Sequence, residues 1–488
     1  MHITANFSRR RKMKDMPTLR KGVLSLKEAY GQAMAVTAPL GSVVSTSTAA
    51  VAYAGYGVVF ATLLGLVGSA MWVYTLTRYA KRVASAGGFY TYGSFATKSK
   101  VVAFFESITE AVAYTVLNAV NAFAVYLLLE TFAQMSGINF PVWVYWLGFI
   151  LTIAAPTLLS LIDVKVLLSR IVSVSATLEV LLLFGLFAYS VAVKGLQLQY
   201  FEVPNIPMSN LGDAMILTIV SISGAGAATY LGEETKVPLE TITRGMWLSL
   251  GLGGLAILLG TYGMVSLWSG SLTSLENSPQ PLLQEAIRLS LLFSVVVLLL
   301  SLNSLIMSNV GTTVGSARIL FNLARERALP KPFMKLNRQV QPIVATIFAG
   351  ALSLMFALVA LAYTQFNVDQ AFNEISVVVS VFWLAGRIVD AFGVPIMLFR
   401  LGTLNLIETA IPIGAGVLNG IGLVLSYSSP DAFQVGLPLA VVVVGVVWYL
   451  LRARYSDVGR LVVDENNQLV TIDEYYERLK RKAGQLKG

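Results

Sequence analysis

Two long apolar segments of this chain are interrupted by small and helix-breaking residues. The first carries Ala-Pro-Leu-Gly-Ser at residues 38–42, and the second carries Ser-Gly-Ala-Gly at residues 223–226. A break inside an apolar helix leaves backbone N–H and C=O groups unpaired, and hydrocarbon cannot satisfy them. We therefore expect each break to bind a polar group through backbone dipoles, helped by the hydroxyls of Ser42 and Ser223.

An interrupted helix presents two oppositely charged backbone ends. The N-terminus of its second half carries about half a positive charge, and the C-terminus of its first half carries a comparable negative charge. A zwitterion fits between such ends, and paired breaks at matching positions of two halves are typical of secondary-transporter substrate sites. The alternative is that the small residues only allow close helix packing. Pro39 beside Gly41, together with the matching second break, favours the binding site.

Ionisable side chains within apolar segments form a second group of candidates, because each costs at least ~2.5 to 3.5 kcal/mol at a helix centre. Glu179 is the most informative: a carboxyl taken out of water can hold a proton near neutral pH. It is either a protonation switch for proton coupling or a structural acid paired with a base or with the backbone. Glu106 and Glu110 are expected nearer the cytoplasmic side, against basic loop residues.

Arg387 and Asp390 stand three residues apart, and hence on one face of a helix. They either neutralise each other as a structural pair or line an access pathway.

The composition is that of a polytopic membrane protein. Hydrophobic residues make up 56% of the chain and charged residues only 12%, against roughly a quarter charged in soluble domains. Runs of about 20 apolar residues can cross the bilayer, and they predict an all-α fold with twelve spans. The predicted spans are 31–54, 57–81, 98–134, 141–162, 165–194, 209–232, 243–270, 284–315, 341–364, 372–399, 408–427 and 432–452.

Basic residues set the expected orientation. If the N-terminus is cytoplasmic, only Lys194 and Arg288 of the 35 Lys and Arg residues fall in external loops, and Arg387 lies within a span. We therefore expect both termini in the cytoplasm and a first span that is retained as an anchor. The net charge of +9 follows from these flanking residues, and no nucleic-acid-binding module accompanies it.

Thiol and metal chemistry have almost no residues to use. The chain has no cysteine, and its one histidine is His2. We expect no cofactor, no metal site and no enzymatic activity, because the Cys and His ligands on which most metal sites depend are missing.

Four motifs occur in order along the chain. They are Ala-Pro-Leu-Gly-Ser at 38–42, Ser-Ala-Gly-Gly-Phe-Tyr-Thr-Tyr at 85–92, Glu-Glu-Thr-Lys-Val-Pro at 233–238, and the segment 316–330 that begins Ser-Ala-Arg-Ile-Leu-Phe. Together they resemble the amino acid-polyamine-organocation transporter superfamily, in its amino acid permease type. The resemblance covers spans one to nine.

This resemblance implies the leucine-transporter fold, with two inverted five-helix repeats, broken helices one and six, and two peripheral helices. The implied regions are a cytoplasmic segment at 1–30, a transport core at 31–400, peripheral helices at 401–452 and a cytoplasmic tail at 453–488. Within the core, the repeats lie at about 31–194 and 209–400.

The resemblance also implies the substrate contacts. Backbone N–H groups of the first break would hold a carboxylate, and carbonyls of the second would accept an ammonium group. Ala225 and Gly226 replace the family's usual aromatic residue and acid, so we expect a wider and less polar pocket unless residues of span three or span ten refill it. The implied substrate-binding residues are Pro39, Leu40, Gly41, Ser42, Val43, Ser223, Gly224, Ala225 and Gly226.

Two further sites follow from the resemblance. Asn303 and Ser304 occupy the region where some relatives complete a sodium site, although ordinary interhelical hydrogen bonding would also explain them. Glu233, Glu234 and Lys236 form either a cytoplasmic gate, with Arg78, Arg82 and Arg244 as further members, or a solvated rim.

The leading functional hypothesis is secondary active uptake of amino acids or related organic amines, coupled to protons by alternating access. The alternatives are substrate/product exchange without ion coupling and, in another class, a channel-like membrane protein. The expected partners are an amino acid, H⁺ and the lipid bilayer, in the plasma membrane. A monomer and a homodimer both remain open.

Overall fold

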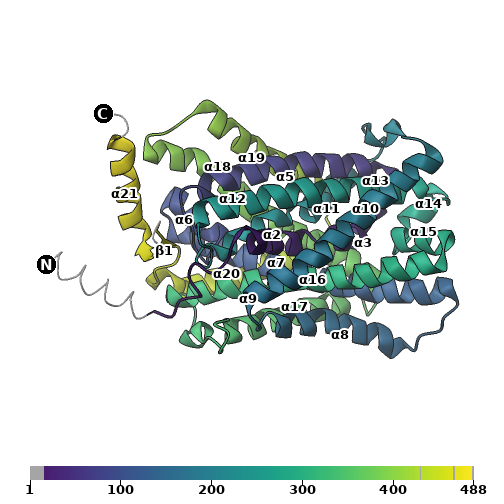
Figure 1. Cartoon of the computed structure of the whole chain (residues 1–488), viewed down its shortest axis with the longest axis horizontal. Coiled ribbons are helices and arrows are strands. Elements are labelled where there is room, and N and C mark those ends of the chain that lie inside the picture. Colours follow the sequence, from purple (N-terminus) through teal and green to yellow (C-terminus); the bar gives the residue numbers. More distant parts are fainter. Residues whose placement is uncertain (1–15, 429, 465–467, 486–488) are drawn as a thin grey trace.

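The computed structural model describes residues 16–428, 430–464 and 468–485 of the chain. The long helices lie side by side along one common direction (Figure 1). They are α5 (Val58–Ala80), α7 (Lys100–Ser136), α8 (Val142–Leu159), α10 (Ser173–Lys194), α11 (Met208–Ile222), α12 (Pro238–Ser249), α13 (Leu255–Leu267), α16 (Leu291–Arg325), α17 (Ile343–Tyr363), α18 (Val368–Leu401), α19 (Leu406–Ser426) and α20 (Ala432–Leu451).

Shorter elements connect and cap these helices. They are α2 (Leu26–Thr37), α3 (Pro39–Val44), α4 (Thr46–Ala54), α6 (Phe89–Thr97), α9 (Val164–Val166), α14 (Leu272–Glu276), α15 (Pro281–Leu289), α21 (Ile472–Gln485) and the strands β1 (Leu461–Val463) and β2 (Leu469–Thr471). Wider π-helical turns join α9 to α10 and α12 to α13.

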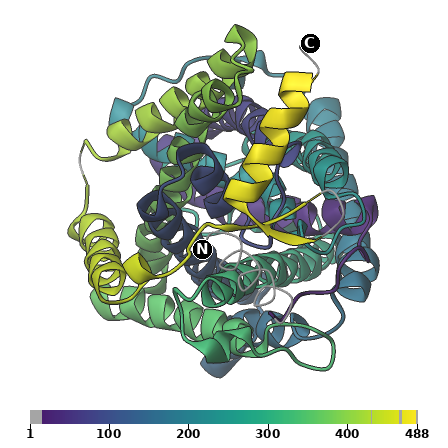
Figure 2. The same ribbon diagram turned by 90° about the vertical axis from the view of Figure 1, so that its left-hand side faces the viewer.

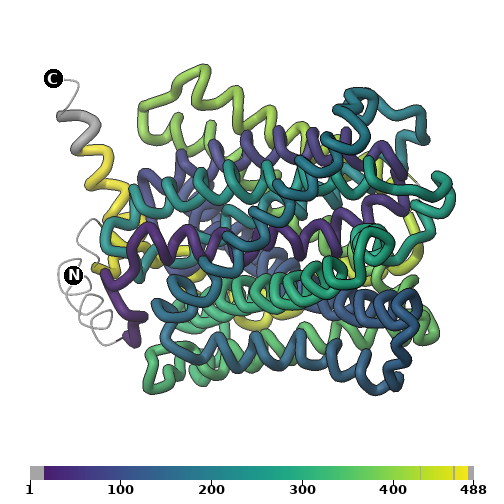
Figure 3. The backbone as a smooth tube through the Cα atoms, turned by 45° about the vertical axis from the view of Figure 1, so that its right-hand side comes forward, coloured from purple at the N-terminus to yellow at the C-terminus, as the bar shows by residue number. Residues whose placement is uncertain are grey.

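Within the described residues, eleven helical segments are long and apolar enough to cross a membrane, not the twelve that we predicted. The predicted span 31–54 is not counted because it is divided: α2 and α3 are each too short to cross alone, and α4 continues into α5 as one counted segment, Thr46–Ala80. Figure 3 shows this purple segment passing through the interior of the bundle.

Pro39 explains the first division. The residue before a proline is disfavoured in the α conformation, and Ala38 adopts a left-handed conformation with φ of 37°. Its N–H still donates to Met34 O at 2.7 Å, which closes α2. Pro39 then opens α3, where its missing N–H costs nothing.

The second interruption is a change of helix type. α11 ends at Ile222, and the backbone continues as tighter 3₁₀ turns from Ser223 to Leu231. Small residues at 223–228 allow this segment to pack against α2. A Cβ placed on Gly224 would lie 2.2 Å from Thr37 N and 2.4 Å from Val36 C. The two interruptions are therefore in backbone contact.

The bundle is closed at one end, the predicted cytoplasmic end, by the chain's tail. β1 and β2 form an antiparallel hairpin, and Val463 N donates to Ala84 O at 2.8 Å. On α21, the ring of Tyr476 packs on Phe95 of α6 with centroids 5.0 Å apart. Figure 2 shows this hairpin and α21, in yellow, across the end of the bundle.

We expect Gly224→Ala to destabilise the protein, because the added methyl group meets backbone atoms that cannot rotate away. Overpacking of this kind costs about 1–3 kcal/mol, and the thermal unfolding midpoint of the purified protein measures it. Gly420→Ala in α19 is the matched control, because a Cβ there meets nothing within 4 Å. Equal midpoints for the two variants would contradict the backbone contact between the interruptions.

Candidate functional site

The N-terminus of α3 faces a buried carboxylate from α10. Glu179 is 2% exposed, and its Oε2 accepts hydrogen bonds from Leu40 N at 3.3 Å and from Ser304 Oγ at 2.6 Å. Its Oε1 accepts from Ser175 Oγ at 2.8 Å. The negative charge therefore lies where the α3 dipole is positive, which is the favourable arrangement.

The first backbone amides of α3 all have protein acceptors. Gly41 N donates to Ser304 Oγ at 2.8 Å, and Ser42 N donates to Ala38 O at 2.7 Å. The position expected for a substrate carboxylate is thus occupied in this structure by Glu179 and Ser304. Pro39, Leu40, Gly41, Ser42 and Val43 are all buried there.

Ser42 connects the first break to the second. Its Oγ lies 2.7 Å from Thr37 O and 3.0 Å from Ser221 O. A hydroxyl has one hydrogen, so the two carbonyls share a single donor. The expected role of this hydroxyl at the site becomes a link between the two interruptions.

The carbonyl end of α11 faces a buried cation from α18. Arg387 Nη2 donates to Ser223 O at 3.2 Å, and Trp383 Nε1 donates to Ser223 Oγ at 3.1 Å. The guanidinium carbon lies 5.2 Å and 5.3 Å from the ring centres of Trp72 and Trp383. The carbonyl that we expected to accept a substrate ammonium therefore binds Arg387 here.

The space beside Gly226, where we expected a wider pocket, is filled by side chains of α5 and α6. A Cβ on Gly226 would lie 2.7 Å from Phe89 Cζ and 2.9 Å from Leu76 Cδ1. Other helices thus fill the volume that the missing aromatic side chain would take. Gly224, Ala225 and Gly226 are all buried.

Asn303 and Ser304 join α16 to α10. Asn303 Nδ2 donates to Ser175 Oγ at 2.5 Å, and Ser175 in turn donates to Glu179. Ordinary interhelical hydrogen bonding, one of the two explanations we kept open, accounts for both side chains. Ser175 was missed, although its position four residues before Glu179, on the same helical face, is a usable signal.

The expected internal pairing of Arg387 with Asp390 is not formed. Arg387 faces Glu110 of α7, and Asp390 lies beside Glu106 of the same helix. The expectation that Glu106 and Glu110 meet basic loop residues is also wrong, because both are 3% exposed within the bundle. Packing of α7 against α18 offers each group a closer partner than its own helix does.

The two carboxylates predicted to form a gate or a solvated rim are buried, and they form ion pairs with partners other than those expected. Arg325 binds Glu233 with both guanidinium nitrogens, at 3.0 and 2.8 Å, and Arg318 Nε lies 2.7 Å from Glu234 Oε2. Burial raises the pKa of Glu234, and the charge of Arg318 opposes that shift. Leu19 N also donates to Glu233 Oε1 at 3.1 Å.

The basic residues that we expected at this gate bind elsewhere. Arg78 and Arg82 lie 2.9 and 3.5 Å from Glu408 of α19, and Arg244 pairs with Glu240 one turn away. Lys236 has an exposed side chain. Arg318 and Arg325 lie in the 316–330 motif, which the sequence already singled out without revealing their partners.

Glu326 ties the tail to this gate. Its carboxylate accepts hydrogen bonds from Gly459 N at 2.9 Å, Leu461 N at 3.0 Å and Tyr90 Oη at 3.0 Å. Burial raises the pKa of Glu326 to about 7, and these hydrogen bonds oppose the shift. The hairpin, α6 and α16 thus share one carboxylate.

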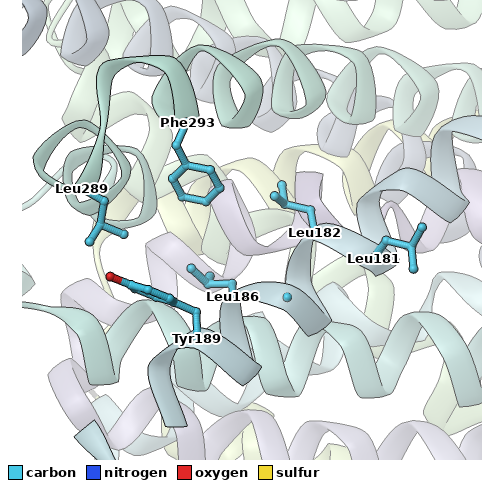
Figure 4. A pocket seen from close by; sticks show the side chains of 7 residues that line it. Leu181, Leu182, Leu186, Tyr189, Leu289 and Phe293 are labelled. Carbon is cyan, nitrogen blue, oxygen red and sulfur yellow. The ribbon is translucent and has the colours of Figure 1, made fainter. Parts of the chain in front are cut away.

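An apolar groove of about 440 Å³ lies away from both breaks, between α10 and the start of α16. Figure 4 shows Tyr189 and Phe293 lining it with leucine side chains. Its residues are largely exposed, as Leu181 and Tyr189 are, and they offer no charged group to a zwitterion. The groove fits a lipid-facing surface and is not the candidate site.

Comparison with known proteins shows which family and which relatives this chain resembles. The amino acid permease family matches residues 29–390. The low-affinity putrescine importer PlaP of Escherichia coli K12 is 26% identical over 333 residues, covering 64% of this chain and 71% of the importer. The same importer from Escherichia coli O157:H7 matches equally.

A solved structure, MhsT in complex with L-phenylalanine, aligns with a TM-score of 0.54 at 15% sequence identity. The alignment covers 83% of this chain and 99% of MhsT. At this level of identity the likeness concerns the fold, and it supports the leucine-transporter type expected from the sequence.

We expect Ser304→Ala to lower the free energy of unfolding by about 1–3 kcal/mol, because it leaves Gly41 N–H without its acceptor and removes one of the three donors to Glu179. Thermal or denaturant unfolding of the purified protein measures the loss. Ser301→Ala is the control: Ser301 lies one turn earlier on α16, is equally buried, and its hydroxyl has no hydrogen-bond partner among the described residues. Equal losses would argue against the Ser304 network.

Proposed function

Because this chain belongs to the amino acid permease family, we propose that it moves amino acids or related organic amines across the membrane by proton-coupled alternating access. It is a multi-pass membrane protein and a secondary transporter rather than an enzyme. The observation that carries the coupling proposal is the contact between Glu179 and the N-terminus of α3.

Protonation of Glu179 would release the α3 amides for substrate. An ionised Glu179 accepts three hydrogen bonds, from Leu40 N, Ser304 Oγ and Ser175 Oγ. A protonated carboxyl gains a donor and loses its charge, so its hold on backbone N–H groups weakens. A substrate carboxylate can then take its place at the helix dipole. Proton and substrate would therefore bind together, which is the requirement for symport.

The substrate ammonium would take the opposite end of the site. Ser223 O now accepts a hydrogen bond from Arg387, and the carbonyls of Gly224 and Ala225 follow directly on the same segment. An ammonium group here would replace a guanidinium donor with another cation. The carboxylate of a zwitterion would thus replace the charge of Glu179, and its ammonium group would replace the charge of Arg387.

Alternating access would require the buried gate to open. The pairs of Glu233 with Arg325 and Glu234 with Arg318 are inaccessible to solvent, so the predicted cytoplasmic end is closed in this conformation. Separation of these pairs would expose four charges, which water can solvate. This closed end is consistent with a site that opens to the opposite side first.

The proposed architecture keeps the twelve-crossing assignment. The α2–α3 segment counts as one broken crossing, which pairs with the α11 segment in the second of two inverted repeats, at about 31–194 and 209–400. Residues 1–30 and 453–488 are placed in the cytoplasm, and 401–452 holds the peripheral helices. The proposed location is the plasma membrane.

Two alternative functions use the same site in different ways. The first is an exchanger, in which Glu179 stays ionised and substrates replace one another. The second is an amine carrier: a diamine such as the putrescine named for PlaP has no carboxylate and would not need to displace Glu179. The α3 amides already have protein acceptors, Glu179 and Ser304, and this arrangement favours an amine, which needs no amide donors.

Glu179→Gln is expected to abolish accumulation driven by a pH gradient in proteoliposomes, because glutamine cannot exchange the proton. One pH unit supplies about 1.4 kcal/mol per proton, enough for roughly tenfold accumulation at zero membrane potential. Exchange of external for internal substrate should persist in the variant. Glu240→Gln, which changes an exposed acid on α12, is the control. Tenfold accumulation by the Glu179 variant would overturn Glu179 as the coupling residue, whereas a wild type that exchanges substrate without accumulating it would be better described as an exchanger.

A ligand screen by thermal shift is expected to find stabilising compounds among the amino acids and small amines. A ligand at 100 times its Kd contributes about 2.7 kcal/mol to the native state. Gly41→Leu should lose this shift while the protein still inserts, because a Cβ there already lies 2.9 Å from Ser304 Oγ. Stabilisation retained in Gly41→Leu would place binding away from the first break, and stabilisation by amines alone would favour the amine carrier.

A further inference from the structure

A second cluster of ionisable groups lies between α7 and α18. Glu106 and Glu110 project from consecutive turns of α7, and Arg387 and Asp390 project from one face of α18. Their exposed fractions are 3%, 3%, 2% and 0%. Three acids and one base thus share a buried region, and one base cannot neutralise all of them.

The positive charge of Arg387 lies near only one of the three acids. It interacts with Glu110, which also accepts a hydrogen bond from Tyr230 Oη at 3.2 Å. A Cβ on Gly386 would lie 2.6 Å from Glu110 Oε1, so this carboxylate is held closely against the backbone of α18. Glu106 and Asp390 therefore remain without a cation of their own.

The carboxyl groups of Glu106 and Asp390 lie within hydrogen-bonding reach of each other. Their four oxygens have no other hydrogen-bond partner among the described residues. Two bare carboxylates in this position would repel each other, and buried oxygens without donors would be costly. One proton between them removes the repulsion and supplies the missing donor.

The site is closely fitted around this pair. A Cβ on Gly93 of α6 would lie 1.9 Å from Glu106 Oε2, so any side chain at that position would displace the carboxyl. Tyr79 Oη donates to the backbone carbonyl of Asp390 at 2.8 Å, and its ring stacks on Tyr92 with centroids 5.1 Å apart. These contacts leave the carboxyls facing each other.

The other charged and titratable groups around the pair are accounted for. Those that interact with it are Glu110, Tyr79 of α5 and Tyr92 of α6. α16 also packs on α7, but its cations Arg318 and Arg325 bind Glu234 and Glu233. α8, α17 and α20 carry no Asp, Glu, Lys, Arg or His.

We propose that Glu106 and Asp390 form a second proton-binding site, distinct from Glu179, that joins α7 to α18 through one shared proton. Release of that proton breaks one O–H bond, leaves the electron pair on the carboxylate and passes H⁺ to water. The two negative charges then repel each other across the helix contact. Because α18 also holds the second break through Arg387 and Trp383, this step would reach the ammonium half of the substrate site.

The transport role of this site rests on the proposed function, but its proton does not. Asp390→Asn and Glu106→Gln each replace the shared proton with a permanently attached amide hydrogen. The folded wild type binds a proton that unfolded carboxyls lose at neutral pH, so its stability must fall as pH rises. We expect the thermal midpoint of the purified protein to fall from mildly acidic to mildly alkaline pH, and this slope to be smaller in both variants.

Glu240→Gln is the control. It changes an exposed acid on α12, and it should leave both the midpoint and its slope with pH unchanged. A wild-type slope in Asp390→Asn and Glu106→Gln would overturn the proposal. If neither variant can be purified, the infrared spectrum of the wild type serves instead, and a spectrum without a protonated-carboxyl band at neutral pH would equally overturn it.

Proteoliposome transport separates this proposal from the proposed function. We expect Asp390→Asn to lose accumulation driven by a pH gradient and to keep substrate exchange, which needs no proton. If the wild type exchanges neither amino acids nor amines, the proposed function fails, whereas the pH slope of stability still tests the carboxyl pair. A variant with wild-type accumulation would overturn the coupling role of the pair.

Discussion

The backbone groups released by the helix breaks impose the constraint on which the centre of this protein depends. Inside a membrane these groups must be satisfied by protein or ligand. Glu179 and Ser304 meet the amides of α3, and Arg387 meets the carbonyl of Ser223. In the described conformation the protein thus supplies one anion and one cation at the positions where a zwitterion would bind. Under the proposed function, substrate binding would replace these internal charges rather than fill an open cavity.

Small residues make this arrangement compact. Gly224 lets the second break touch the backbone of α2, and the hydroxyl of Ser42 bridges to Ser221 O. Where Ala225 and Gly226 omit large side chains, Phe89 and Leu76 occupy the volume. The two interruptions therefore form one packed unit. Because their backbone atoms are in contact and cannot change rotamer, a side chain added at one break must displace the other.

The buried acids are stabilised in three ways: by arginines, by hydrogen-bond donors as at Glu179 and Glu326, or by each other as at Glu106 and Asp390. The gate carboxylates bind arginines directly, as Glu233 does with Arg325. Glu106 and Asp390 face each other without a cation, and this is the arrangement in which a proton is the natural counter-charge. Under the proposals above, Glu179 and this pair are two places where proton occupancy would change the packing of helices that hold the breaks.

The sequence by itself determined the membrane class, the positions of both breaks, the family resemblance and the buried acid at 179, because these follow from apolar run length, proline and glycine chemistry, and local spacing. It did not determine the partners. The sequence predicts Arg387 either in a pair with Asp390 or along an access pathway, and Glu233 either in a gate with basic loop residues or on a solvated rim. In the structure Arg387 faces Glu110, and Glu233 binds Arg325. Spacing along one helix shows which side chains share a face, but the rotation and depth of the neighbouring helix decide which charge that face meets. Only tertiary packing sets those two quantities.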